Sequence, residues 1–200
     1  MVRLNLEALK SLKEYVVLDI ETTGLDPEQD DIIELSFLHI RKRTIVYAFD
    51  SFARLDLKKE NTAKYVNGIE EEQLANAPHI KDVLAFFYGY TALRGIPNYV
   101  GHNIAFDIQF LRQKFERYLG RDGRLHMAHF FCTMRMATDI YELEKWPTLE
   151  ELAGGLGIEA DGPLHISKND VLVTYKAFRI LRKELLRKYR KSSQRVIYIK

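Results

Sequence analysis

The stretch Val16-Val17-Leu18-Asp19-Ile20-Glu21-Thr22-Thr23-Gly24 decides the fold of this chain. Its first half is a β-branched, mostly apolar run that predicts a buried strand, and Gly24 and Pro27 then predict a turn. Asp19 and Glu21 are two residues apart, so on a strand both carboxylates point to the same face. Burying two like charges there is costly unless hard cations such as Mg²⁺ or Mn²⁺ compensate them. The alternative is one partly exposed acid beside one salt-bridged acid.

The segments that follow predict an α/β fold with a mixed sheet. Residues 32–40 and 44–52 are expected to form two strands joined by the polar turn Arg41-Lys42-Arg43, which extends the first strand into an antiparallel meander. Short strands are expected at 98–101 and 130–131. Helices are expected within 62–87 with breaks at Gly68 and Pro78, over 105–119, after Thr133 as a cap, after Thr148, and from about 168 to 189.

Length and composition restrict the class of protein. A chain of 200 residues with 46% hydrophobic and 29% charged residues suits one folded domain with a sizeable core. We find no apolar run of membrane-spanning length, and charged residues interrupt the N-terminal segment where a signal peptide would be apolar. The single cysteine, Cys132, has no partner for an internal disulfide, which favours a reducing, cytoplasmic setting.

The charge is distributed unevenly along the chain. Residues 179–200 contain nine Lys or Arg and one acid, which gives this segment a charge of +8 and leaves −6 for the rest. A basic segment on an acidic body suits a nucleic-acid ligand together with a cation site. The alternative is an ordinary solvated helix face.

Two further stretches carry acids at the starts of helices. The first is His102-Asn103-Ile104-Ala105-Phe106-Asp107, and the second is His165-Ile166-Ser167-Lys168-Asn169-Asp170. An acid in a first helical turn is favoured by the helix dipole, which is the plainer explanation of Asp107. Ser167 and Asp170 also fit the S-x-x-D form of a capping box, which would make Asp170 a helix-start residue alone.

Taken together, the three stretches resemble the DEDDh family of 3′→5′ exonucleases. This ribonuclease H-like group includes the proofreading ε subunit of bacterial DNA polymerase III. The resemblance spans roughly residues 15–186. It is close in the first two motifs and weaker in the third, which has Ile166-Ser167 where Arg-Ala commonly follows the histidine and Val171 where alanine is common. Asn67 also stands where many relatives have histidine.

The resemblance implies a ribonuclease H-like fold with a central five-stranded mixed sheet flanked by helices. It implies two Mg²⁺ or Mn²⁺ ions held by four carboxylates, with His165 as the general base. The expected metal ligands are Asp19, Glu21, Asp107 and Asp170. The expected substrate-binding residues are Thr22, Thr23, Gly24, Leu25, Asn67, His102, Asn103 and Phe106.

The activity that follows from the resemblance is metal-dependent release of nucleoside 5′-monophosphates from single-stranded 3′ ends. DNA is the favoured substrate, in proofreading or repair, with a DNA polymerase or another replication or repair subunit as a candidate partner. An exoribonuclease and a catalytically idle nucleic-acid-binding module remain as alternatives.

We expect an N-terminal extension over 1–14, an exonuclease domain over 15–190 and a basic tail over 191–200. The alternating residues near the end of that tail look strand-like, and they suit an edge strand, a contact with a polymerase or another copy, or an ordered tail.

Overall fold

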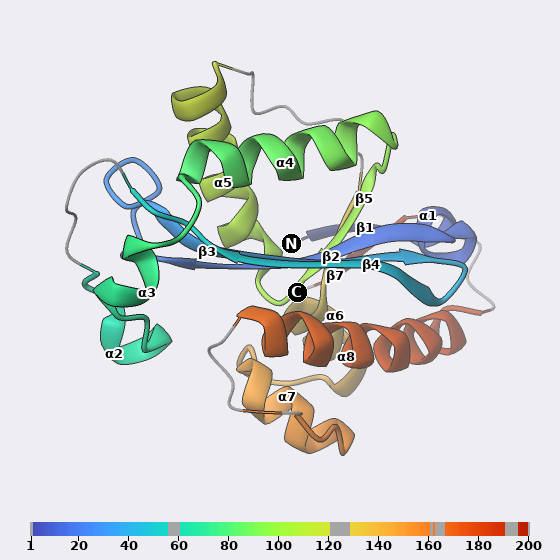
Figure 1. The fold of residues 1–200 in the computed structure, drawn as a ribbon. Coiled ribbons are helices and arrows are strands. Elements are labelled where there is room, and N and C mark those ends of the chain that lie inside the picture. Colours follow the sequence, from blue (N-terminus) through green and yellow to red (C-terminus); the bar gives the residue numbers. More distant parts are fainter. Residues whose placement is uncertain are drawn as a thin grey trace.

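A five-stranded mixed sheet forms the centre of the molecule (Figure 1). The computed structural model describes residues 2–55, 61–120, 129–160, 162, 167–190 and 196–199. The strand order is β4-β3-β2-β5-β6, with antiparallel pairing between β2, β3 and β4 and parallel pairing from β2 through β5 to β6. The strands are β2 (Glu14–Thr22), β3 (Ile32–Arg41), β4 (Thr44–Phe52), β5 (Asn98–Gly101) and β6 (His129–Cys132). The expected meander and the expected parallel strands are therefore both confirmed.

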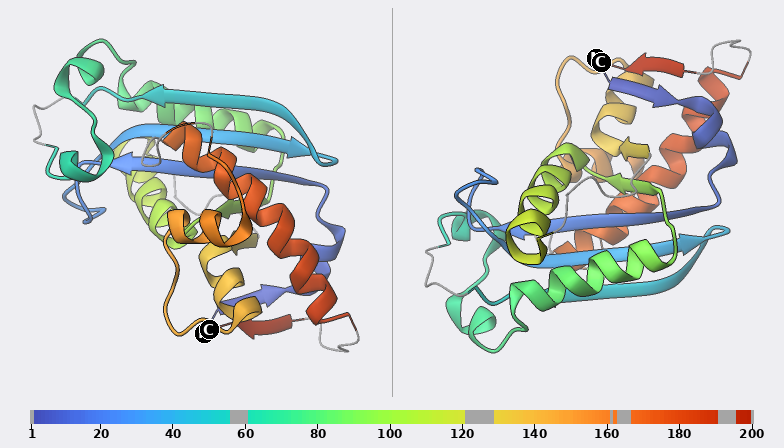
Figure 2. Two further views of the ribbon diagram at one scale, coloured as in Figure 1. Left: turned by 90° about the horizontal axis from the view of Figure 1, so that it is seen from below. Right: turned by 90° about the horizontal axis from the view of Figure 1, so that it is seen from above.

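Helices cover both faces of this sheet (Figures 1 and 2). Alternate residues of β2 serve the two layers: Val16 and Leu18 pack in one hydrophobic core, and Tyr15 and Val17 in the other. One face carries α4 (Ile80–Leu93) and α5 (Ile104–Leu119); the other carries α6 (Thr133–Tyr141), α7 (Leu149–Leu156) and α8 (Ser167–Lys188). A strand buried on both sides needs apolar residues at nearly every position, which is what this part of the sequence has.

The expected helix breaks also appear. Helices α2 (Lys64–Asn67) and α3 (Glu71–Ala75) are separated at Gly68, which has φ +66°, and Pro78 precedes the start of α4. Thr148 caps α7 through a hydrogen bond from the Glu151 backbone N–H. The expectation that Thr133 caps α6 is wrong, because α6 begins at Thr133 itself and Cys132 occupies the capping position.

The two ends of the described chain pair with each other. Strand β1 (Val2–Asn5) lies antiparallel to β7 (Val196–Ile199), and α1 (Leu6–Ser11) follows β1. The alternation near the C-terminus thus forms a strand, but in a separate two-stranded sheet. The domain boundaries at 14/15 and 190/191 stay predictions. Within the described part of the chain, none of the helices combines the length and apolar character needed to cross a bilayer.

Candidate active site

Three carboxylates converge where β2 ends and α8 begins. Asp19 and Glu21 lie on β2, Asp170 lies in the first turn of α8, and one oxygen of each lies within 4.8 Å of the others. Because β2 and α8 are far apart in sequence, packing of α8 on the sheet creates this cluster. The arrangement supplies hard oxygen ligands of the kind that Mg²⁺ and Mn²⁺ prefer.

Asp107 reaches the same strand from the opposite helical layer. Its Oδ1 accepts a hydrogen bond of 3.2 Å from the Ile20 backbone N–H, between Asp19 and Glu21, and its side chain is buried. The paired residues of β5 reach only Val17 on β2, so the Ile20 N–H lies beyond the end of the parallel ladder. The end of β5 thus leaves room for a carboxylate from α5.

The pKa values of Asp19, Glu21 and Asp107 are raised because their carboxyl groups are buried close to one another. Burial, followed by the charges of Asp107, Asp170 and Glu21, raises the pKa of Asp19 well above its usual range. Burial and then the charge of Glu34 raise the pKa of Glu21 to about 8. Burial also raises the pKa of Asp107, although hydrogen bonds from backbone N–H groups act in the opposite direction. Cations bound here would relieve this repulsion, so the donor set fits divalent metal ions.

Glu34 is a fifth acid at this edge, and the sequence motifs do not include it. It lies opposite Glu21 in the β2–β3 pairing and is only 2% exposed. Burial and the charge of Asp50 raise the pKa of Glu34 to about 7. Glu34 and Ser36 are polar residues two apart within an otherwise apolar strand, a pattern that the sequence alone shows. Only the pairing of β3 with β2 shows that Glu34 lies beside Glu21.

A hydrogen-bond network ties the start of α8 to the sheet. Ser36 Oγ donates to Asp50 Oδ1 at 2.5 Å, and Ser167 Oγ donates to Ser36 Oγ at 2.7 Å. The Ser167 backbone N–H also approaches Glu34 Oε2 at 3.4 Å. Ser167 therefore anchors the helix to β3 and does not act as the capping serine of the S-x-x-D pattern. His165, the expected general base, lies outside the described residues.

The turn after β2 presents one apolar side chain to solvent. Leu25 is 82% exposed, whereas Thr22 and Thr23 are buried. Thr22 Oγ1 donates to the Gly24 carbonyl at 2.6 Å, and Thr23 Oγ1 accepts from the Asp31 N–H at 3.0 Å. A side chain at Gly24 would come within 2.6 Å of the Asp30 carboxylate, so Asp30 would have to shift to admit one. Both threonine hydroxyls are used in hydrogen bonds within the turn, and Leu25 lies exposed at its tip.

A buried ion pair holds the far side of this turn. Lys114 of α5 is fully buried, and its Nζ lies 3.0 Å from Asp31 Oδ1. Asp31 precedes β3 and exchanges hydrogen bonds with Thr23. Sequence reasoning did not select either residue, because a lysine on an amphipathic helix ordinarily faces solvent.

Asn67 and His102 use their side chains within the protein. Asn67 Nδ2 donates to the Thr22 carbonyl at 3.1 Å, and its Oδ1 accepts from Asn61 Nδ2 and the Ile69 N–H. His102 Nε2 donates to the Pro147 carbonyl at 3.1 Å, and Nδ1 lies 3.0 Å from the Thr133 hydroxyl. Because a carbonyl only accepts, the proton of the neutral ring lies on Nε2. Both residues brace segments that surround the acids.

The two remaining expected substrate residues lie at the start of α5. Asn103 precedes the helix in a left-handed conformation, with φ +62°, and is exposed. Phe106 is half-buried, and its ring centroid lies 4.8 Å from that of Phe110. Part of the Phe106 ring therefore packs against α5, and the rest remains accessible.

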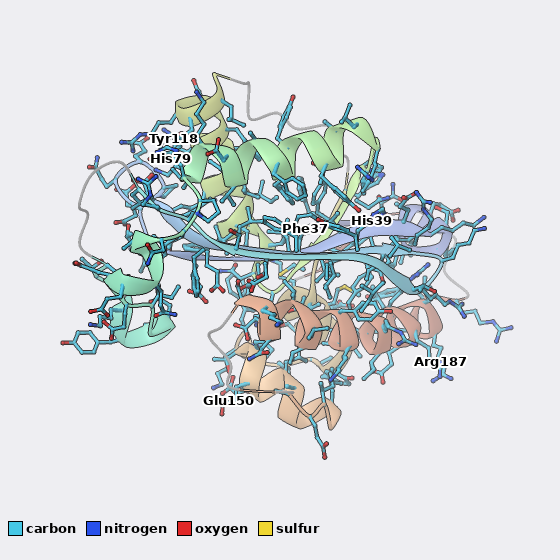
Figure 3. All side chains as sticks on the ribbon, viewed as in Figure 1. Phe37, His39, His79, Tyr118, Glu150 and Arg187 are labelled. Atoms are coloured by element: carbon cyan, nitrogen blue, oxygen red, sulfur yellow. The ribbon has the colours of Figure 1, made fainter. Side chains whose placement is uncertain are left out.

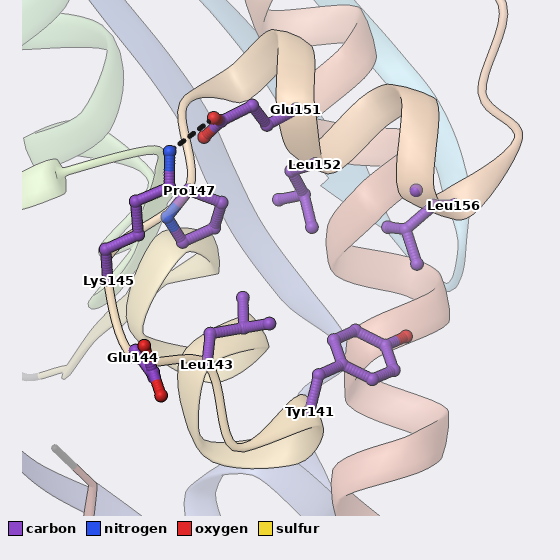
Figure 4. Close-up of a pocket in the computed structure, with 9 residues that line it drawn as sticks. Tyr141, Leu143, Glu144, Lys145, Pro147, Glu151, Leu152 and Leu156 are labelled. Atoms are coloured by element: carbon purple, nitrogen blue, oxygen red, sulfur yellow. Dashed lines mark hydrogen bonds and ion pairs between the residues drawn. The ribbon is translucent and has the colours of Figure 1, made fainter.

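A mostly apolar pocket of about 560 Å³ lies beyond His102, between the α6–α7 loop and α7 (Figure 4). Tyr141, Leu143, Pro147 and Leu152 contribute to its wall, and Lys145 forms an ion pair of 2.7 Å with Glu151 at its rim. The carbonyl of Pro147 connects this wall to the His102 ring. None of the clustered acids lines the pocket.

Comparison with known proteins identifies the family. Residues 16–178 match the family described as Exonuclease, RNase_T. The chain belongs to this exonuclease family. A PolC-type DNA polymerase III of Thermotoga maritima is 31% identical over 166 residues, which are 82% of this chain and 11% of that protein. The DNA polymerase III subunit epsilon of Aquifex aeolicus is 28% identical over 175 residues, which are 88% of this chain and 83% of that protein.

Solved structures agree on the fold of this exonuclease-family chain. Escherichia coli Exonuclease I in complex with a dA16 oligonucleotide superimposes with a TM-score of 0.75 at 18% identity, covering 90% of this chain and 42% of that one. Exonuclease X in complex with 5′ overhanging duplex DNA gives a TM-score of 0.56 at 22% identity, covering 83% of this chain and 92% of that one. The ribonuclease H-like fold expected from the sequence is confirmed. The chain spans about a tenth of the length of the PolC-type relatives that it matches.

Proposed function

We propose that this chain is a divalent-metal-dependent 3′→5′ exonuclease of the DEDDh type that releases nucleoside 5′-monophosphates from single-stranded DNA. The observation that carries this proposal is the convergence of Asp19, Glu21 and Asp170 within 4.8 Å. Asp107, bonded to the backbone between the first two, adds a fourth acid. Relatives named as DNA polymerase III subunits support DNA as the substrate and a polymerase as a partner.

The four carboxylates would hold two Mg²⁺ or Mn²⁺ ions. When bound, such ions activate a water molecule and stabilise the developing charge on a scissile phosphate. Glu21 and Asp19 lie side by side on a rigid strand, and Asp170 is fixed through the Ser167–Ser36 contact three residues earlier in the chain. The protein thus prepares the ligand geometry before any ion arrives, which lowers the cost of assembling the site.

Residues around the acids would position the nucleotide and move protons. His165, five residues before Asp170, is the proposed general base that accepts a proton from the attacking water, and its ordinary pKa suits neutral pH. Leu25, exposed at the turn tip, would pack on the terminal base, and Phe106 would lie beside the sugar. Asn67 and His102 would act by bracing these segments, since their polar atoms bond within the protein.

Asp170→Asn tests the metal assignment. The variant removes one negative ligand but keeps the side-chain shape, so hydrolysis of a 3′-labelled single strand should fall by at least about 10²-fold with Mg²⁺ or Mn²⁺. Asp82→Asn, at an exposed acid in the first turn of α4, is the matched control and should retain the parent rate. Chelation of divalent ions should abolish the activity of the parent protein.

The same assay separates the alternatives. Equal rates for Asp170→Asn and the parent protein would exclude the carboxylate cluster as the catalytic centre. Binding without hydrolysis in every metal tested would favour the catalytically idle module. Matched DNA and RNA strands should show faster cleavage of DNA, and the reverse order would identify an exoribonuclease.

A further inference from the structure

At the end of the molecule farthest from the acidic cluster, three segments that are distant in sequence lie together (Figures 1 and 2), and each carries basic residues. They come from the loop after α1, from the β3–β4 turn and from the second half of α8. We call this surface the distal basic patch, and it consists of Lys13, Lys42, Arg43, Arg179, Lys183 and Arg187, all exposed. Figure 3 shows Arg187 extending from α8 away from the body of the protein.

Two hydrogen bonds to backbone carbonyls hold the three segments together. The Lys42 N–H donates to the Lys13 carbonyl at 2.7 Å, which joins the turn to the loop after α1. Tyr175 of α8 donates its hydroxyl to the Arg43 carbonyl at 2.9 Å, which joins the turn to the helix. The guanidinium of Arg179 lies 5.6 Å from the centre of the Tyr175 ring. The patch is therefore built by the fold, which holds the backbone positions that carry its charges in place.

The acids near this patch are engaged with other partners. Glu7 pairs with Lys10, and Glu14 pairs with Arg41 and His39. Glu184, the acid within this half of α8, accepts a hydrogen bond of 2.6 Å from the Tyr141 hydroxyl. Among the described residues, Lys42, Arg43, Lys183 and Arg187 take part in none of the ion pairs. Lys42 and Arg43 also occupy left-handed positions, with φ +48° and +73°, where a tight hairpin favours glycine or asparagine. The turn thus presents two cations where neutral residues would fit the backbone better.

The distance between the distal basic patch and the acidic cluster determines which part of a bound strand the patch can contact. Along α8, Lys183 and Arg187 lie about 20 and about 26 Å from Asp170 at 1.5 Å per residue. A stacked strand advances about 3.4 Å per nucleotide, so this span corresponds to roughly six to eight nucleotides. A nucleotide at the acidic cluster is too far away to touch the patch, but a strand of about eight or more nucleotides could reach it.

We propose that the distal basic patch binds the phosphodiester backbone of the nucleic acid whose 3′ end occupies the acidic cluster. The inference rests on the proposed function, and it adds a second contact region that serves only longer substrates. Exposed Lys and Arg side chains bind phosphates without reading sequence. An acidic segment of a partner protein is the competing ligand, and the experiment below separates the two.

The test compares two triple variants with the same change in charge. Lys42→Gln/Lys183→Gln/Arg187→Gln neutralises the patch, and Arg54→Gln/Lys81→Gln/Arg112→Gln neutralises exposed cations after β4 and on α4 and α5. Affinity for a fluorescent 20-nucleotide oligothymidylate is measured by anisotropy in chelator over a series of salt concentrations. The patch variant should bind about tenfold more weakly, and its logarithmic salt slope should fall by about 2, since each phosphate contact contributes about 0.7.

A tetranucleotide supplies the second readout. The patch variant should hydrolyse it at the parent rate, because so short a strand ends before the patch. Equal affinity of the two triple variants for the 20-mer would overturn the proposal, and this is the result expected if the patch serves an acidic protein. Failure of the proposed function would look different, as absence of tetranucleotide hydrolysis in the parent protein. Thermal unfolding of each variant confirms that it is folded.

Discussion

At the scale of single residues, His102 shows how a motif histidine can serve the structure. Its two ring nitrogens connect the end of β5 to Thr133 and Pro147. Burial lowers the pKa of His102 to about 4, although the Pro147 carbonyl acts in the opposite direction. The folded protein therefore holds this ring neutral at neutral pH.

This lowered pKa predicts a pH-dependent contribution to stability. Between about pH 6.5 and 4 the unfolded chain binds a proton at this position that the folded chain does not, so stability falls as the pH falls. His102→Gln removes the titrating group but retains an amide donor. The excess stability of the parent protein over the variant should shrink by about 3 kcal/mol from pH 7 to pH 4 in urea unfolding. A constant difference across this range would contradict the neutral, buried assignment.

At this scale the sequence identified the acids that lie in local motifs. It did not identify charged residues that reach the site only through strand pairing or helix packing. Asp19 and Glu21 are placed on one face by strand alternation alone. Glu34 joins them only through the pairing of β2 with β3, and Lys114 pairs with Asp31 only through the packing of α5. The metal-ligand and base assignments themselves stay predictions.

At the scale of elements, the contact between α8 and β3 positions the third motif. Ser36→Ala deletes the hydroxyl that joins Asp50 to Ser167 and leaves the network incomplete. We expect hydrolysis or the apparent metal affinity to fall by about tenfold, as for other groups that orient metal ligands. Ser51→Ala, on neighbouring β4, is the control because its hydroxyl bonds only locally to the Phe52 carbonyl.

The readout must distinguish orientation from loss of folding. Metal titration of the reaction rate should shift in Ser36→Ala while the far-ultraviolet circular dichroism stays unchanged. Identical metal titrations for the two serine variants would show that the network has no influence on the site.

Most elements were predictable because hydrophobic periodicity and chain-breaking residues agree along this sequence. The expectation of a Thr133 cap was wrong, and the capping-box alternative for Ser167 is not found; both concern hydroxyl groups at helix starts. Thr133 and Ser167 match local capping preferences, but tertiary partners take their side chains: Thr133 bonds with the His102 ring, and Ser167 bonds with Ser36. Local propensity cannot anticipate a partner more than 30 residues away.

At the scale of the whole molecule, Arg182 joins α8 to the N-terminal segment. Its guanidinium donates to the carbonyls of Leu9, Lys10 and Leu12 at 2.9, 3.2 and 3.0 Å, where α1 ends. These charge-assisted bonds satisfy carbonyls that the helix leaves without intrahelical partners. The charge asymmetry that is visible in the sequence thus conceals at least one structural arginine among the surface cations.

Arg182→Gln should destabilise the protein by about 1.5–3 kcal/mol in denaturant unfolding, because carbonyls would lose a charged donor. Lys183→Gln, the adjacent exposed residue, should change the unfolding free energy by less than about 0.5 kcal/mol. Equal stability of the two variants would show that the three contacts contribute nothing measurable.

The global topology followed from the sequence through the family resemblance, but the pairing of the chain ends did not. The first residues contain no strong strand signal, and their partner strand lies almost 200 residues away. Contacts of such separation depend on the completed fold, which brings the two segments together.

The pairing of Val2 with Ile199 places both ends of the described chain at one spot on the surface (Figure 2). Polypeptide continuing from either end would therefore depart from the same location. Such geometry suits grafting the domain into a loop of a host protein, or joining its ends through a brief linker and reopening it elsewhere, without stretching the host or disturbing the sheet.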